Sequence, residues 1–156
     1  NEAVKKWGIK TSYVRAVATG IFNETYIVKT GSATFVLQKL HALISNPGPT
    51  ENYAAVAGFL AEKNIAAQKV MPLTNGDLIF KDGGRAWRLL RSIPGRVYSK
   101  TKNAAMAKEA GMGLGRFHKA VADFNGNLRK TLPMFRYAKV LRRLRSNRGE
   151  FVDKKR

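Results

Sequence analysis

Four short stretches of this chain carry residue types that could bind a phosphorylated nucleotide. The first is residues 20–25, Gly-Ile-Phe-Asn-Glu-Thr, which lie between two predicted strands. A turn built from a glycine and small polar residues can point backbone N–H groups at a phosphate. An ordinary hairpin turn has the same composition, so this stretch alone is a weak signal. Its candidate contacts are Gly20, Phe22, Asn23 and Thr25.

The second and third stretches place a cation and a carboxylate where they could act together. Lys39 ends a predicted strand, and a lysine beside a phosphate loop can neutralise phosphate charge, although a solvated lysine is common there. Side chains alternate along a strand, so Gln38 and Lys39 point to opposite faces, and we favour Lys39 as the nucleotide-facing residue. Glu51 could pair with Lys39, or simply favour the positive end of its helix.

The fourth stretch, residues 87–95, is an apolar strand that ends in Pro94-Gly95. It predicts a hinge in which the backbone from Arg91 to Ile93 could read the edge of an adenine ring. The alternative is a strand end followed by a plain linker.

Hydrophobic patterning supplies the elements that would position these groups. Thr50 is the expected cap of the first long helix, after Pro49. Because short hairpin-connected strands dominate, the predicted class is α+β, a twisted antiparallel sheet of five to six strands with one packed helix and a long linker helix after it. The predicted strands are 12–19, 26–28, 34–38, 68–71, 77–80 and 86–90, and the predicted helices are 50–63, 102–124 and a short basic one at 137–147.

The order of loop, strand lysine, helix glutamate and hinge is the order of a kinase small lobe. In this order of features, the chain resembles the N-terminal lobe of the phosphotransferase enzyme family. That family includes aminoglycoside phosphotransferases, choline kinases and homoserine kinases. It looks most like the N-acetylhexosamine 1-kinases. The resemblance covers roughly residues 5–145 and is carried by residues 20–28, 35–40, 51–52, 87–95, 110–118 and 132–135.

The resemblance implies a nucleotide-binding lobe over residues 1–95, followed at 96–156 by a linker helix and the start of a second lobe. It implies that ATP, with Mg²⁺, lies under the loop 20–25 and that Glu51 pairs with the base on the third strand. The expected substrate is a small hydroxyl compound, with an amino sugar as the leading candidate, and the expected location is the cytoplasm.

The residues that would catalyse phosphoryl transfer are missing from this sequence. Such transfer needs a catalytic Asp with a metal-binding Asn five positions later. None of the chain's four aspartates has that Asn, and neither His41 nor His118 begins a His-x-Asp triplet. We therefore expect the chain to be part of a longer kinase and to be inactive alone. A degenerate gene product is the other possibility.

The charge of the chain raises a competing function. The formal net charge is +19, with a pI of about 10.7, and nine basic residues lie between positions 136 and 156. This balance attracts polyanions, so a basic nucleic-acid-binding module is the alternative, although no helix-turn-helix, zinc or RRM signature is present.

The chain has no cysteine and no apolar run of membrane-spanning length. If the chain is a single lobe, the exposed wall of its nucleotide cleft could also favour association between copies of the chain.

One glycine pattern imitates a phosphate loop. Gly111, Gly113 and Gly115 alternate with apolar residues, but they fall inside the predicted helix 102–124. Close packing of that helix against a neighbour is the preferred interpretation. His118, on the same helix, has no partner carboxylate in a motif and is interpreted as a surface or core histidine.

Overall fold

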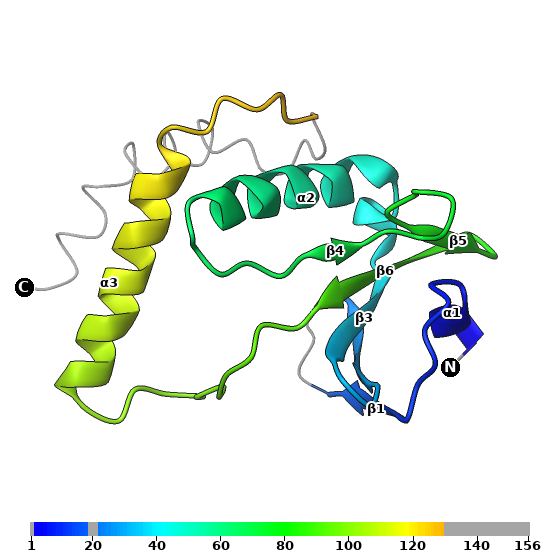
Figure 1. Ribbon diagram of the computed structural model, residues 1–156, viewed down its shortest axis with the longest axis horizontal. Coiled ribbons are helices and arrows are strands. Elements are labelled where there is room, and N and C mark those ends of the chain that lie inside the picture. The colour runs from blue at the N-terminus through cyan, green and yellow to red at the C-terminus, as the bar shows by residue number, and fades with distance from the viewer. Residues whose placement is uncertain (1, 19–21, 130–156) are drawn as a thin grey trace, which may run out of the picture.

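The computed structural model describes residues 2–18 and 22–129, and its centre is an antiparallel sheet of six strands (Figure 1). The strand order is β1-β2-β3-β6-β4, with β5 paired to β6. This arrangement confirms the predicted α+β fold. The strands are β1 (Tyr13–Val17), β2 (Glu24–Lys29), β3 (Thr34–Leu40), β4 (Val70–Met71), β5 (Phe80–Asp82) and β6 (Arg85–Arg91).

One face of the sheet is covered by the N-terminal segment. The short helix α1 (Glu2–Lys5) and Trp7 pack on a core that includes the fully buried Leu37 and Leu89. The indole Nε1 of Trp7 also donates a 2.8 Å hydrogen bond to the carbonyl of Met71 on β4. Ala3, Val4 and Trp7 of this segment therefore belong to the domain core, which the sequence patterns did not predict.

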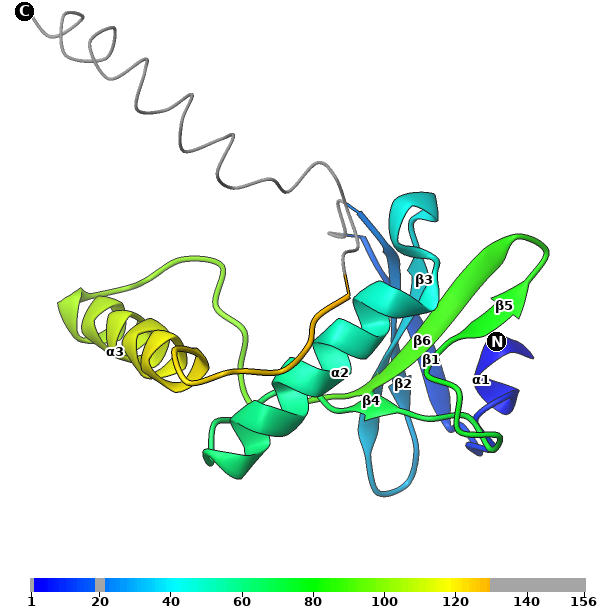
Figure 2. The ribbon, with the colours of Figure 1, turned by 90° about the horizontal axis from the view of Figure 1, so that it is seen from above.

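The long helix α2 (Pro47–Glu62) crosses the opposite face of the sheet (Figure 2). Its N-cap is Asn46, whose side-chain oxygen accepts from the N–H of Gly48 at 3.2 Å. The prediction that Thr50 caps this helix is wrong, because the helix starts three residues earlier and Thr50 is fully buried within it. A 3-10 turn, η1 (Ala42–Ile44), joins β3 to this helix.

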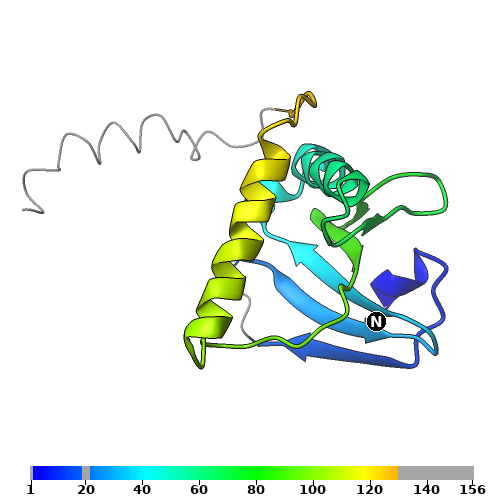
Figure 3. The ribbon, with the colours of Figure 1, turned by 60° about the vertical axis from the view of Figure 1, so that its left-hand side comes forward.

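Helix α3 (Ala104–Val121) follows an extended linker after β6 and stands to one side of the sheet, with its C-terminal end near α2 (Figure 3). The chain just after α3 contacts the end of α2, where the rings of Phe59 and Phe124 lie 5.2 Å apart and Lys63 and Asp123 form a 3.4 Å ion pair. None of the helices in the described ranges is long and apolar enough to cross a bilayer.

Several local predictions need correction. A Cβ atom added at Gly111, Gly113 or Gly115 would meet nothing within 4 Å, so these glycines do not mediate the predicted close packing among the described residues. The strand predicted at 77–80 lies at 80–82, because the side chain of Asn75 forms a turn by accepting from the N–H of Asp77 at 3.1 Å. The helix predicted at 137–147 lies outside the described residues.

Candidate functional site

The face of the sheet toward α2 carries a row of polar side chains. In the strand register, Thr25 of β2 is opposite Gln38 of β3, and Gln38 is opposite Arg88 of β6. Directly opposed residues share a face, so these side chains form one row across the three strands. The sequence predicted Thr25 as a contact and gave Gln38 as a candidate ranked behind Lys39, and the structure brings Thr25 and Gln38 together with Arg88.

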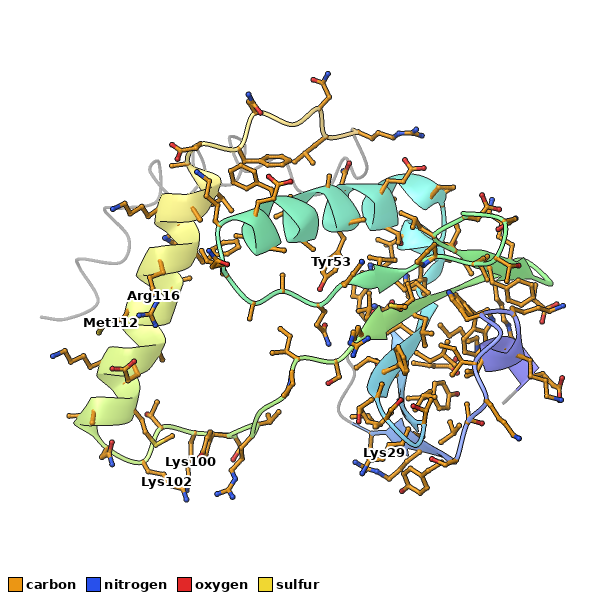
Figure 4. All side chains as sticks on the ribbon, viewed as in Figure 1. Lys29, Tyr53, Lys100, Lys102, Met112 and Arg116 are labelled. Carbon is orange, nitrogen blue, oxygen red and sulfur yellow. The ribbon has the colours of Figure 1, made fainter. Side chains whose placement is uncertain are left out.

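Arg88 is held in place by both the sheet and the helix. Its Nε donates a 2.9 Å hydrogen bond to Oε1 of Gln38, and its guanidinium lies 5.1 Å from the ring centre of Tyr53. Tyr53 extends from α2 toward the sheet (Figure 4). Burial lowers the pKa of the Arg88 guanidinium and raises the pKa of the Tyr53 hydroxyl. Both groups are thus removed in part from solvent.

Lys39 lies on the other face of the sheet, where its ammonium pairs with the carboxylate of Glu24. Its neighbour across β6 is Trp87, on the face covered by α1. Glu51 is engaged elsewhere, with its Oε2 2.8 Å from Nε of Arg129. The predicted pairing of Lys39 with Glu51 is therefore wrong, because the sheet separates the two side chains.

The predicted phosphate loop is tied to the end of β3. Oδ1 of Asn23 accepts from the backbone N–H of His41 at 3.0 Å, and the rings of Phe22 and His41 lie 4.7 Å apart. The hydroxyl of Thr25 donates to the carbonyl of Asn23 at 3.4 Å. The structure thus places three of the four loop candidates at one end of the polar row, while Gly20 lies outside the described residues.

An apolar row runs beside the polar one. Val36 is opposite Ile27 on one side and the buried Leu90 on the other, two positions along from Gln38 and Arg88. Two successive rows on the same face, one apolar and one polar, therefore place the half-buried Ile27 and Val36 next to a polar, cationic row, while Leu90 is buried.

The hinge candidates follow β6 directly. The backbone N–H of Arg91 already donates to Lys69 at 2.8 Å, and that of Ser92 donates to Thr34 at 3.0 Å. In the described part of the chain, no acceptor pairs with the N–H of Ile93. The Arg91 side chain is exposed. Of the predicted hinge contacts, Ile93 therefore keeps its backbone donor open and Arg91 does not.

Ile93 also lines a groove of about 1000 Å³ between α2 and α3. Its walls come from α2 and residues 64–68 on one side and from Arg116 and Phe117 of α3 on the other. Tyr53 and Arg116 project from the two helices (Figure 4). The groove connects the hinge to the helix that carries Tyr53.

No metal cage is formed by these residues. Across residues 2–18 and 22–129, there is no group of three or more His, Cys, Asp or Glu side chains that could hold an ion. The described residues therefore do not form a protein-built Mg²⁺ site.

The architecture defines a fold class: a protein-kinase-like small lobe, with α2 on one face of an antiparallel sheet and a linker from β6 to α3. The chain belongs to the phosphotransferase enzyme family, whose model matches residues 14–154.

Individual relatives agree with the family. The chain is 26% identical over 121 residues to the homoserine kinase of Zymomonas mobilis, covering 78% of this chain and 37% of that enzyme. Its fold is similar to that of the amicoumacin kinase hAmiN, solved with AMP-PNP, Ca²⁺ and amicoumacin, with a TM-score of 0.64, 16% identity and coverage of 76% and 37% of the two chains. For the spectinomycin phosphotransferase APH(9)-Ia, solved with ADP and spectinomycin, the TM-score is 0.52, the identity 11% and the coverage 73% and 34%. The chain thus spans little more than a third of each of these proteins.

Sequence reasoning missed Arg88 and Tyr53 as members of the site. Arg88 stood within the hinge stretch, where its neighbours Trp87 and Leu89 were interpreted as strand residues. A signal was present, because Arg88 interrupts an otherwise apolar strand, and a charged residue within such a strand is uncommon unless it has a partner.

Proposed function

We propose that this chain is the ATP-binding lobe of a small-molecule kinase that phosphorylates a hydroxyl group. The observation that carries the proposal is the pair of rows on the α2 face, apolar at Ile27, Val36 and Leu90 and polar at Thr25, Gln38 and Arg88. Membership of the phosphotransferase enzyme family supports it.

The two rows match the two halves of a nucleotide. The apolar row and the open N–H of Ile93 suit a purine base, which needs a flat hydrophobic contact and an edge-on hydrogen bond. The polar row, with the loop 22–25 at its end, suits the phosphates. In phosphoryl transfer the protein contributes mainly positioning and charge stabilisation, so a lobe that holds the phosphates performs part of the catalysis.

The transfer step itself needs groups that this sequence lacks. No Asp of the chain is followed five positions later by Asn. We therefore propose that the isolated chain transfers no phosphate, because half of the cleft and the metal ligands belong to a second lobe. Mg²⁺ would then be held by those ligands together with the phosphates. The proposed location is the cytoplasm, which a kinase using ATP and a sequence without cysteine would both fit.

The proposed acceptor is an amino sugar such as an N-acetylhexosamine. The resemblance of residues 20–28, 35–40 and 87–95 to that branch supports it. The homoserine kinase relative supports a wider range of small hydroxyl compounds, so homoserine belongs in the same assay. An acceptor panel on the full gene product would decide between them, with phosphate transfer to homoserine alone counting against the amino sugar.

Isothermal titration tests the nucleotide proposal. Mg-ATP and a short RNA are titrated into this chain and into the gene product carried to its own stop codon. The Val36→Trp variant places an indole in the apolar row and should abolish ATP binding, whereas Val97→Trp, at a position 95% exposed, should leave it unchanged. Binding of RNA at physiological salt without binding of ATP to either protein would instead favour the nucleic-acid alternative that the net charge of +19 raises.

A further inference from the structure

We propose that Arg88, and not a lysine of strand β3, is the cation that binds the phosphates of the nucleotide. The inference rests on the proposed function and assigns the charge within that site. The sequence pointed to Lys39 for this role because it ends the strand, and only the register of the folded sheet shows which cation reaches the α2 face.

The positions of Gln38 and Arg88 in the sheet support this assignment. Gln38 occupies the point of β3 that faces α2, and it is neutral. Arg88 lies directly across from it on β6, and the 2.9 Å hydrogen bond from Nε to Oε1 of Gln38 sets the direction of the guanidinium. The cation of this face therefore lies on β6 and not on β3, at the same register position as Gln38.

The charge of the Arg88 guanidinium also supports the assignment. Among residues 2–18 and 22–129, no carboxylate lies within ion-pair distance of Arg88, although four other cations in these ranges have such partners. Burying a cation without a counter-charge is costly, and an anionic ligand offsets that cost. Because Nε is already used, the outer guanidinium nitrogens keep their donors, and two parallel donors suit the oxygens of a phosphate.

Lys39 differs from Arg88 both in the face of the sheet that it occupies and in having a paired charge. Its side chain is 16% exposed and neutralised by Glu24, and it shares its face with Trp87 and the α1 cluster. Reaching the α2 face would require it to pass through the sheet. Lys39 thus serves as a matched control, since it is a cation one residue from Gln38 whose charge is already balanced.

Tyr53 adds a positioning element. Its ring lies 5.1 Å from the guanidinium, on the helix rather than on the sheet. A guanidinium between an amide oxygen and an aromatic face is fixed in two directions. A movement of α2 relative to the sheet would therefore change the contact on one side of the guanidinium, while the bond to Gln38 would hold the other side.

The test uses the gene product carried to its own stop codon, with binding of Mg-ATP, Mg-ADP and adenosine measured by isothermal titration. Arg88→Gln should weaken ATP binding by roughly 10- to 100-fold, the range for a charge-assisted hydrogen bond, and leave adenosine binding unchanged. Lys39→Gln should change ATP binding by less than about threefold, because its ammonium is paired with Glu24 on the other face of the sheet. Circular dichroism confirms that each variant is folded.

A charge relocation distinguishes a phosphate contact from a structural role. The double variant Gln38→Lys with Arg88→Gln returns a cation to the same row, and it should recover most of the ATP affinity that Arg88→Gln loses. Normal ATP binding by Arg88→Gln would overturn the inference, as would equal losses for ATP and adenosine or no recovery in the double variant. Failure of the unmodified protein to bind ATP would instead refute the proposed function itself.

Discussion

The contact of Trp7 with β4 leads to a strong stability prediction. The side chain is only 7% exposed, it packs on the same cluster as the fully buried Leu37 and Leu89, and its indole donates to the carbonyl of Met71 at 2.8 Å. Trp7→Ala removes both the ring and the donor. The expected loss in the free energy of unfolding is roughly 3–5 kcal/mol, the range for a large aromatic residue truncated in a core.

A second variant separates the two contributions. Trp7→Phe keeps an aromatic ring but removes the N–H, so the carbonyl of Met71 loses this donor. The hydrogen bond contributes about 0.5–1.5 kcal/mol, and the smaller ring adds a similar loss of buried area, for a total of roughly 1–3 kcal/mol. Trp7→Phe should therefore be intermediate between the unmodified chain and Trp7→Ala.

Urea unfolding followed by far-ultraviolet circular dichroism measures both losses without depending on the fluorescence of the mutated residue. Val97→Ala, at a site 95% exposed, is the control and should change stability by less than about 0.5 kcal/mol. The reasoning is refuted if Trp7→Ala costs less than about 1 kcal/mol, because residues 2–7 would then not unfold together with the sheet.

Three further predictions concern the turns, the cap of helix α3 and the ion pair between Lys39 and Glu24. Gly84 has φ +77°, so Gly84→Ala should lower the free energy of unfolding in urea by about 1 kcal/mol. Gly31→Ala, in an open turn, is the control and should be neutral or slightly stabilising. Equal losses at the two positions would contradict this prediction. Asn103→Ala removes the acceptor of the Met106 N–H at 2.9 Å and should lower helicity and cost about 1 kcal/mol, with Asn127→Ala as the control. The hydrogen bond from Lys39 holds the pKa of Glu24 below its ordinary 4.5, so the stability that the pair contributes is present above pH 4.5 and is lost as the pH falls through the lowered pKa. The difference between the unmodified chain and Lys39→Met should shrink over that range, and a constant difference from pH 7 to pH 3 would show that the ion pair is not its cause.

The sheet was predictable from sequence because its strands are β-branched, aromatic and joined by glycine-containing turns. The start of α2 was missed even though its signals were present. Asn46 followed by Pro47 is a favourable cap and first position, since proline is tolerated where the helix has no N–H to pair. The predicted helix began only after Pro49, and its cap was assigned to Thr50 instead.

The cation of the site could not be predicted because it depends on pairing between distant strands. Alternation along β3 established that Gln38 and Lys39 face opposite ways, but it did not indicate which side α2 would cover. The partner of Gln38 is Arg88, 50 residues further along the chain. A contact of that separation depends on the strand order, which local patterns do not contain.

The same strand order has a consequence for how the domain is made. β3 at the centre of the sheet bonds on one side to β2, its neighbour in sequence, and on the other to β6. During synthesis the hairpins of β1, β2 and β3 can form as soon as they emerge, whereas β4 and β5 have no partner until β6 is available. The ribosome must therefore release residues up to Arg91 before the core closes. Until then, the apolar cluster around Leu37 lacks Leu89, its partner on β6.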